Sequence, residues 1–403
     1  MKTLASLTQL LDPEVLADPY PLYRQLRSED PVCWDPLLHA WVVTGYRDVV
    51  TVLHEFSAER TPSPEKLAAI GLGDLGPIAR VMVKQMLFMD PPAHARVRRL
   101  AAQAFTPHRV AVLHEHIRDV VARLLDRVEH NGRLDVIADL GEPLPYTITA
   151  EMLGVPVDDA PKLKAWSQDF AEMLGNFQHN PERAADVGRS VEAMTAYFRD
   201  AIRDVRARPR AGLIASFLEA SADGDRFSDE EVVANTIVTM VGGQETTTNL
   251  IGNGMLTLLR HPLQLQRLQD DPDAIPPAVE EMLRFEPPSQ QTARLAPSDI
   301  VLGGKAIRER QAVIAVMAAA NRDPARFTEP EHFDIARADN RHLSFGWGAH
   351  FCFGAALARM EAQITFAALL RRFRRFRLES GTLQWRANLG LRGLLSLPVA
   401  FEV

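Results

Sequence analysis

The segment from Ser228 to Pro262 constrains the fold more than any other part of this 403-residue chain. Ser228 and Glu231 have the spacing of a capping box at its start, and Pro262 stops the helical pattern. The sequence between these signals is predominantly apolar, and as a helix it would extend roughly 50 Å at 1.5 Å per residue. A helix so long and so apolar must cross the core of the molecule, so the other elements have to pack around it.

The remaining patterns are mostly helical. Apolar residues recur at three- and four-residue spacings from about Pro107 to Pro209. Strand signals are short and late: TARLA at 292–296, DIVLGG at 299–304, AVIAVMA at 312–318 and the C-terminal LLSLPVAFEV. No internal repeat and no linker rich in Gly, Ser or Pro divides the chain. The sequence therefore predicts a mainly α protein with a small β region, folded as a single domain over residues 1–403.

Charge and the N-terminal sequence argue against two classes of protein. The formal net charge is −7, so the basic surface that nucleic-acid binding needs is not expected. Asp12, Pro13 and Glu14 interrupt the first segment before any apolar run reaches the ~18 residues of a membrane span. The same segment lacks the basic start and long apolar run of an export signal. We expect a cytoplasmic protein that binds neither nucleic acid nor membrane.

The chain has only two cysteines, Cys33 and Cys352. In a cytoplasmic protein such cysteines are far more often thiols or ligands than a disulfide. A single buried cysteine usually serves as a small hydrophobic side chain, but Cys352 stands in FGWGAHFCFG, residues 345–354. The glycines there permit positive φ angles and close approach of the backbone to a flat or bulky partner. A strong helical sequence follows at once, and a helix N-terminus stabilises a thiolate, so Cys352 is a candidate metal ligand.

This segment resembles the haem-ligand signature of the cytochrome P-450 family, Phe-Gly-x-Gly-x-His-x-Cys-x-Gly in its bacterial soluble members. The resemblance implies the cytochrome P-450 fold, with haem b (iron protoporphyrin IX) between the long central helix and the helix after the cysteine loop. It covers nearly the whole chain, from about residue 18 to the C-terminus. The matching residues are Phe345, Gly346, Gly348, His350, Cys352 and Gly354.

Four further family motifs occur in the expected order, which makes a chance match a weak explanation. One of them, the Glu-x-x-Arg motif, is expected to form a buried ion-pair cluster with a later arginine and to support the haem pocket. The motifs are His94 and Arg98 in DPPAHARVR, Glu245 and Thr246 in GGQETT, Glu281 and Arg284 in AVEEMLRFEPP, and residues 321–324 (NRDP) followed by Phe333, Asp334 and Arg337.

The resemblance also assigns roles to single residues. Cys352 would be the axial thiolate ligand of the haem iron, within the cofactor loop that ends at Gly354, and Phe345 would shield its sulfur. Glu245 and Thr246 would be the catalytic pair that delivers protons. The haem propionates need cationic or hydrogen-bonding partners, and the candidates are His94, Arg98, Arg294 and His350.

The activity implied is that of a haem monooxygenase, which inserts one oxygen atom from O2 into a hydrophobic organic substrate by hydroxylation or epoxidation. A secondary metabolite such as a polyketide or terpenoid is the expected substrate, ahead of fatty acids and steroids. No flavin or nicotinamide module is visible, so a separate ferredoxin and ferredoxin reductase would supply electrons. Two alternatives stay open: a peroxide-driven peroxygenase, although such members tend to lack the acid and alcohol pair, and a non-catalytic haem-binding or recruitment module.

Two regions need the structure to interpret them. Residues 60–92 mix Pro, Gly and Met with short apolar runs, which favours a lid or binding loop over an irregular surface loop. Where the family usually has Ile-Pro-Ala-Gly, this chain has Ile307-Arg308-Glu309-Arg310. That departure puts the geometry of the turn in question.

Overall fold

The structure, a computed structural model, describes residues 5–175, 181–222, 224–379, 381 and 383–403. The chain divides into two compact units, each assembled from segments that are far apart in sequence. The larger unit comprises Met1–Phe56, Glu115–Leu144 and Thr246–Val403, and the smaller unit comprises Ser57–His114 and Pro145–Glu245. The single domain expected over residues 1–403 stays a prediction.

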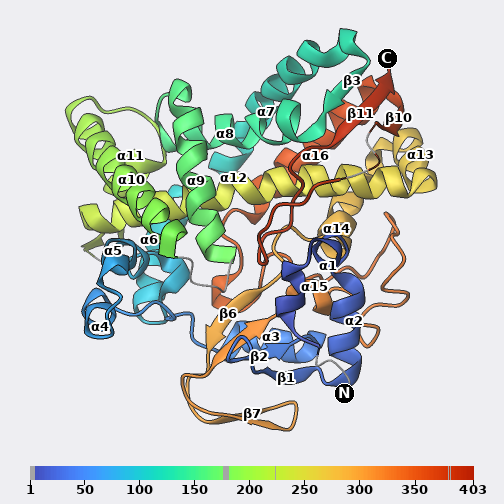
Figure 1. The fold of residues 1–403 in the computed structure, drawn as a ribbon. Helices are drawn as coiled ribbons and strands as arrows, with labels where there is room; N and C mark the ends of the chain where they lie inside the picture. Colours follow the sequence, from blue (N-terminus) through green and yellow to red (C-terminus); the bar gives the residue numbers. More distant parts are fainter. Residues whose placement is uncertain (1–4, 176–180, 223, 380, 382) are drawn as a thin grey trace. The chain divides into compact units, whose positions relative to one another are not determined.

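The expected central helix is α12, Asp229–Arg260, the long yellow helix of Figure 1. Its capping box is present, because the Glu231 N–H donates to Ser228 Oγ (3.2 Å) and the Ser228 N–H donates to Glu231 Oε2 (2.8 Å). In the larger unit, Gly254 lets two other helices approach α12 closely, since a Cβ there would lie 2.7 Å from Met282 Sδ and 2.8 Å from Phe366 Cζ. Those side chains belong to α14 (Ile275–Phe285) and α16 (Ala355–Arg372).

The larger unit contains further helices besides a small amount of sheet. None of the helices that the structure describes is both long and apolar enough to cross a membrane. The helices are α1 (Pro13–Ala17), α2 (Tyr20–Glu29), α3 (Tyr46–Glu55), most of α7 (Pro107–Val128), α13 (Pro262–Asp270) and α15 (Met317–Ala320), with a π-helical turn at Val136–Gly141.

The sheets of the larger unit confirm the predicted strands and add others. A four-stranded sheet has the order β1-β2-β9-β6, in which β2 and β9 are parallel and the other pairs are antiparallel. A three-stranded antiparallel sheet has the order β10-β11-β3, visible at the C-terminus in Figure 1. The strands are β1 (Val32–Asp35), β2 (Ala40–Val43), β3 (Arg133–Asp135), β6 (Thr292–Leu295), β7 (Ile300–Leu302), β8 (Lys305–Ile307), β9 (Ala312–Ala315), β10 (Arg374–Leu378) and β11 (Pro398–Glu402).

The smaller unit is almost entirely helical. Its segment 60–92 is not an irregular loop: it forms α4 and α5 with 3-10 turns at Gly73–Leu75 and Met86–Phe88, and its role as a lid stays a prediction. The helices are α4 (Pro64–Ala69), α5 (Gly76–Met82), α6 (Ala93–Ala104), most of α8 (Pro143–Leu153), α9 (Ala160–Gly175), α10 (Pro181–Ala207) and α11 (Leu213–Glu219), and the hairpin β4 (Ser221–Ala222) and β5 (Asp225–Arg226) follows. Of these, α8, α9 and α10 confirm the helical region predicted from about Pro107 to Pro209.

The Glu-x-x-Arg motif forms the expected buried ion pair in the larger unit. Arg284 Nε and Nη2 each donate to one oxygen of Glu281 at 2.7 Å, and both side chains are fully buried. Arg337 Nε lies 3.2 Å from both oxygens of the same carboxylate. Arg284 Nη1 also donates to the carbonyls of Asn321 (3.0 Å) and Pro330 (2.8 Å). The cluster therefore joins α14 to the loop that follows α15.

The departure at residues 307–310 leaves the turn intact. The Arg310 N–H donates to the Ala296 carbonyl (2.8 Å), and the Gln311 carbonyl accepts from the Ala296 N–H (3.0 Å). Arg310 adopts φ 63°, a left-handed conformation, at the position where the family usually has glycine. A residue with a Cβ pays roughly 1 to 2 kcal/mol for this conformation, so the turn is kept at a cost in stability.

We expect Arg310→Gly to stabilise the protein modestly. Glycine removes the left-handed strain, although part of the gain is offset by the greater entropy of the unfolded chain, so the free energy of unfolding should rise by at most about 1 kcal/mol. Urea denaturation of both proteins measures the difference. A loss of more than 1 kcal/mol in Arg310→Gly would show that the arginine side chain stabilises the turn in another way.

Candidate functional site

Cys352 lies in a closed loop of the larger unit, just before α16. Its N–H donates to the Phe345 carbonyl at 2.8 Å, which ties the two ends of the loop together. Gly346 and Gly348 have φ angles of 71° and 70°, a left-handed conformation that glycine adopts without strain. Because α16 begins at Ala355, the cysteine stands next to the positive end of the helix, as the sequence predicted.

The two cysteines of the chain do not form a disulfide with each other. Cys33 lies on β1, where burial and then the negative charges of Asp30 and Asp35 raise the pKa of its thiol to about 11. That thiol is protonated at neutral pH and is a poor metal ligand. Cys352 is half-buried at the end of the glycine loop, so it is the cysteine whose position suits a thiolate ligand.

Phe345, the residue predicted to shield the sulfur, is held by neighbours from two segments. The Arg359 guanidinium of α16 lies 4.4 Å from the centre of the Phe345 ring, a cation–π contact. The rings of His342 and Phe351 have their centres 5.9 and 6.2 Å from the Phe345 ring. These contacts fix the orientation of the aromatic ring within the cysteine loop.

Glu280 of α14 fixes both Arg359 and His342. Arg359 donates to its two oxygens at 2.7 and 2.8 Å. The Ser344 N–H donates to His342 Nδ1 (3.2 Å), so the neutral ring carries its proton on Nε2 and donates it to Glu280 Oε2 (3.2 Å). Burial opposes ionisation of this carboxyl, but the hydrogen bonds from Arg359 and His342 prevail and lower its pKa to about 2.

The sequence left His342 without a role and did not point to Glu280. Arg359 stands at a usual position of the family signature, but no spacing pattern connects it with an acid on α14. The only available signal was that Glu280 precedes the Glu-x-x-Arg motif directly. The structure therefore adds Glu280 and His342 as residues that position the cysteine loop.

Glu245 and Thr246 are consecutive residues within α12. Glu245 is buried and belongs to the smaller unit, and Thr246 is half-buried and belongs to the larger unit. Adjacent helix side chains point about 100° apart. Gly242, one turn earlier, is exposed, and apart from its chain neighbours and the backbone of its own helix no described atom lies within 4 Å of the place where a Cβ would sit. A ligand can therefore approach the helix backbone closely beside Glu245 and Thr246.

His94 and Arg98 lie one turn apart on the same face of α6, in the smaller unit. His94 is buried, and its pKa is lowered first by burial and then by the positive charge of Arg98. The other two predicted propionate partners belong to the larger unit: His350 is half-buried in the cysteine loop, and Arg294 is buried on β6. Arg294 Nη1 donates to Thr292 Oγ1 and to the Ala293 carbonyl, both at 2.9 Å.

Comparison with known proteins decides which family this site belongs to. The family model described as Cytochrome P450 matches residues 76–399. The chain belongs to the cytochrome P450 family. Its members are haem monooxygenases, so this P450 is an enzyme with a haem cofactor, and the mainly α fold with a small β region is confirmed.

Relatives resemble this P450 over nearly their whole length. The biotin biosynthesis cytochrome P450 of Bacillus subtilis (strain 168) is 38% identical over 403 residues, 99% of this chain and 100% of that protein. The 6-deoxyerythronolide B hydroxylase of Saccharopolyspora erythraea is 34% identical over 395 residues, 96% of each chain. The crystal structure of P450BioI in complex with hexadec-9Z-enoic acid ligated acyl carrier protein has a TM-score of 0.91 and 36% identity, covering 97% of this chain and 99% of that chain.

The residues of the cysteine loop fit a haem. Cys352 would offer a sulfur ligand of the kind that binds the haem iron in P450 enzymes, whereas globins use a histidine. Around Gly354, two residues later, no described atom outside the adjoining backbone lies within 4 Å of the position that a Cβ would occupy. A flat ligand can therefore lie against the loop backbone without meeting a side chain at this position.

Glu361 of α16 is a buried acid that the sequence did not single out. It is 1% exposed, and its Oε2 has no hydrogen-bond partner among the residues that the structure describes. Burial raises its pKa to about 8, because no nearby charge compensates the carboxylate form. Glu361 is therefore protonated in the folded protein at neutral pH.

This raised pKa predicts a pH-dependent stability. The unfolded chain releases the proton near the ordinary pKa of 4.5, whereas the folded chain keeps it up to about pH 8. Below pH 4.5 both states are protonated; between pH 4.5 and 8 only the unfolded chain has released the proton, so the folded state loses stability progressively until the pH passes the folded pKa. We expect Glu361→Gln, which cannot ionise, to gain on the wild type by roughly 4 kcal/mol at pH 8 and to be nearly equal to it at pH 4.5. Urea denaturation at pH 4.5 and at pH 8 measures the difference in the free energy of unfolding between the two proteins. A difference of equal size at both pH values would contradict the raised pKa of Glu361.

Proposed function

We propose that this P450 inserts one oxygen atom from O2 into a hydrophobic organic molecule, by hydroxylation or epoxidation, with electrons from a separate ferredoxin and its reductase. The observation that carries the proposal is Cys352, half-buried at the end of a glycine loop that its own N–H closes on Phe345, directly before α16. A thiolate in this position suits iron ligation. A cytoplasmic location belongs to the same proposal.

The cofactor proposed is haem b, held without a covalent link to the protein. The thioether attachment of a c-type haem uses a C-x-x-C-H pattern, which a chain with cysteines only at 33 and 352 lacks. Cys352 would bind the iron, and the propionates would be paired by His94, Arg98, Arg294 and His350. When bound, the haem supplies the activation of O2 at its iron.

Glu245 and Thr246 would carry protons in this reaction. Glu245 is a buried acid on a predominantly apolar helix, and the Thr246 hydroxyl is next to it in the chain. In the proposed relay the Thr246 hydroxyl would give up its own proton on the oxygen-binding side and take a replacement that originates from the Glu245 carboxyl, which would in turn be reprotonated from solvent. The exposed backbone at Gly242 gives the substrate and O2 room beside this pair. The presence of both residues favours an O2-dependent monooxygenase over a peroxygenase or a non-catalytic haem-binding module.

The proposed substrate is a secondary metabolite such as a polyketide or terpenoid. The 6-deoxyerythronolide B hydroxylase is named for the compound on which it acts, so 6-deoxyerythronolide B is the first compound to test. A fatty acyl chain is the second candidate, because one similar solved structure holds P450BioI in complex with hexadec-9Z-enoic acid ligated acyl carrier protein. Carrier-bound and free acyl chains are therefore both included in the test.

Two measurements on the purified holoenzyme test the proposal. The first is the carbon monoxide difference spectrum, in which the absorbance shift typical of thiolate-ligated haem is expected. The second is turnover of 6-deoxyerythronolide B, free hexadecenoic acid and the same acid on an acyl carrier protein, with ferredoxin, reductase and ¹⁸O2. Incorporation of one ¹⁸O atom supports the proposal. Activity with hydrogen peroxide alone would favour the peroxygenase, and a holoenzyme without the thiolate shift would overturn both enzymatic functions.

A further inference from the structure

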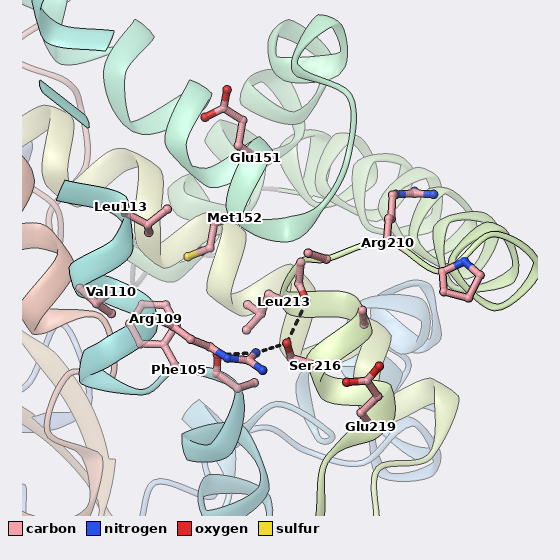
Figure 2. A pocket seen from close by; sticks show the side chains of 15 residues that line it. Phe105, Arg109, Val110, Leu113, Glu151, Met152, Arg210, Leu213, Ser216 and Glu219 are labelled. Atoms are coloured by element: carbon pink, nitrogen blue, oxygen red, sulfur yellow. Dashed lines mark hydrogen bonds between the residues drawn. The ribbon is translucent and has the colours of Figure 1, made fainter. Parts of the chain in front are cut away.

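A pocket of about 690 Å³ lies entirely within the smaller unit. It is bordered by the end of α6, the start of α7, the end of α8, and α11 with the loop 209–212 before it (Figure 2). Its volume falls in the range of roughly 300 to 1,000 Å³ typical of small-molecule sites. None of the residues predicted to hold haem or to move protons lines it. Its apolar wall consists of Phe105, Val110, Leu113, Met152 and Leu213.

The loop 209–212 is fixed against the end of α8. A Cβ on Gly212 would lie 2.8 Å from the Gly154 Cα, so the two backbones are in close contact. Arg210 Nε donates to the Gly154 carbonyl at 2.9 Å, and its guanidinium also binds the Asp204 carboxylate. The positive charge of Arg210 is therefore already compensated by the Asp204 carboxylate.

Arg109 is different, because its guanidinium has only neutral partners. It donates to Ser216 Oγ and to the Ala104 carbonyl (3.4 Å), and Figure 2 shows the guanidinium reaching toward Ser216 among the lining side chains. Across the part of the chain that the structure describes, no carboxylate lies within ion-pair distance of Arg109. A guanidinium has five N–H donors, so most of those of Arg109 remain available to a ligand.

Two carboxylates also line the pocket, Glu151 and Glu219. In Figure 2 the Glu151 side chain points away from the other lining side chains. Glu219 is exposed to solvent at the end of α11, where water and salt weaken its field. Arg109 is exposed as well, but its guanidinium is held at the pocket by Ser216 and the Ala104 carbonyl, so it provides the positive charge next to the apolar wall.

We propose that this pocket binds a small organic anion with an apolar body. The carboxylate of the ligand pairs with the Arg109 guanidinium, a charge-assisted hydrogen bond of the strong kind, and its hydrocarbon part packs against Phe105, Leu113 and Met152. The site is separate from the residues proposed for oxygenation. Because the pocket includes Ala104, the last residue of α6, an occupant contacts the same helix that carries His94 and Arg98.

The test uses the holoenzyme with its haem iron blocked by phenylimidazole, so that binding near the haem is excluded. Calorimetric titration compares sodium decanoate with decylammonium chloride, which have the same chain length and opposite charge. Decanoate should bind the wild type and bind Arg109→Gln at least about tenfold more weakly, which corresponds to 1.4 kcal/mol. Ala215→Trp, which fills the pocket, should abolish the binding. Arg203→Gln, which removes an exposed arginine of the same unit paired with Asp200, is the matched control and should bind like the wild type.

Three results would overturn the proposal: equal affinity of Arg109→Gln and wild type for decanoate, tighter binding of decylammonium than of decanoate, or no binding of decanoate to the blocked wild type. The carbon monoxide spectrum of each variant reports whether it folds around its haem. If Ala215→Trp does not fold, the comparison of Arg109→Gln with the wild type is sufficient to test the proposal. The spectrum also tests the proposed oxygenation independently, since decanoate binding at Arg109 requires no reaction at the haem.

Discussion

Cys352→Ser is expected to abolish turnover and to remove the absorbance shift of thiolate-ligated haem from the carbon monoxide spectrum. A serine hydroxyl is not ionised at neutral pH and cannot supply the electron density that a thiolate gives to iron. The loop itself should survive the change, because it is closed by the Cys352 N–H, which serine keeps, and by the left-handed Gly346 and Gly348. The measurements are the carbon monoxide difference spectrum and ¹⁸O incorporation, with turnover expected to fall by several orders of magnitude.

Cys33→Ser provides the matched control for this experiment. Cys33 lies on β1 in the same unit, and its thiol has a raised pKa because it is buried near Asp30 and Asp35. Its replacement should leave the spectrum and the turnover at the wild-type level. A wild-type spectrum in Cys352→Ser would show that another residue binds the iron, and the proposed function would then lose its main support.

The parts of this molecule that could be predicted from the sequence are those that short segments determine. The capping box at Ser228 and the stop at Pro262 predicted α12 to within a residue or two, because both signals are local. The glycines around Cys352 predicted a loop before a helix for the same reason. The Glu281 and Arg284 ion pair was predicted through a motif that lies on a single turn of α14.

The parts that could not be predicted depend on contacts between distant segments. The strands β1 and β2 are four residues each, and β2 is stabilised by parallel pairing with β9, more than 250 residues later. Glu280 reaches Arg359 and His342 only after α14 and α16 have packed together. Arg310 shows the opposite case, in which the sequence departs from the family but long-range hydrogen bonds to Ala296 keep the turn.

Glu281→Gln is expected to destabilise the protein by roughly 3 to 5 kcal/mol, the usual cost of breaking a buried ion pair from one side. The carboxylate accepts from Arg284 through two bonds, from the Asp334 N–H (3.0 Å) and from Asn340 Nδ2 (3.1 Å), and Arg337 lies beside it. An amide of the same shape keeps some of these hydrogen bonds but leaves the Arg284 charge buried without compensation. Urea denaturation followed by circular dichroism gives the free energy of unfolding, and retained haem absorbance reports the folded fraction.

Arg308→Met is the control, because Arg308 and Asp299 form an ion pair in the same unit with 72% and 61% of their side chains exposed. Water screens such a pair, so its loss should change stability by less than about 1 kcal/mol. If the cost of Glu281→Gln comes from uncompensated charge, the double variant Glu281→Gln with Arg284→Met should recover part of the lost stability. Costs that simply add in the double variant would instead mean that the two side chains stabilise α14 through separate contacts, and that their pairing contributes little.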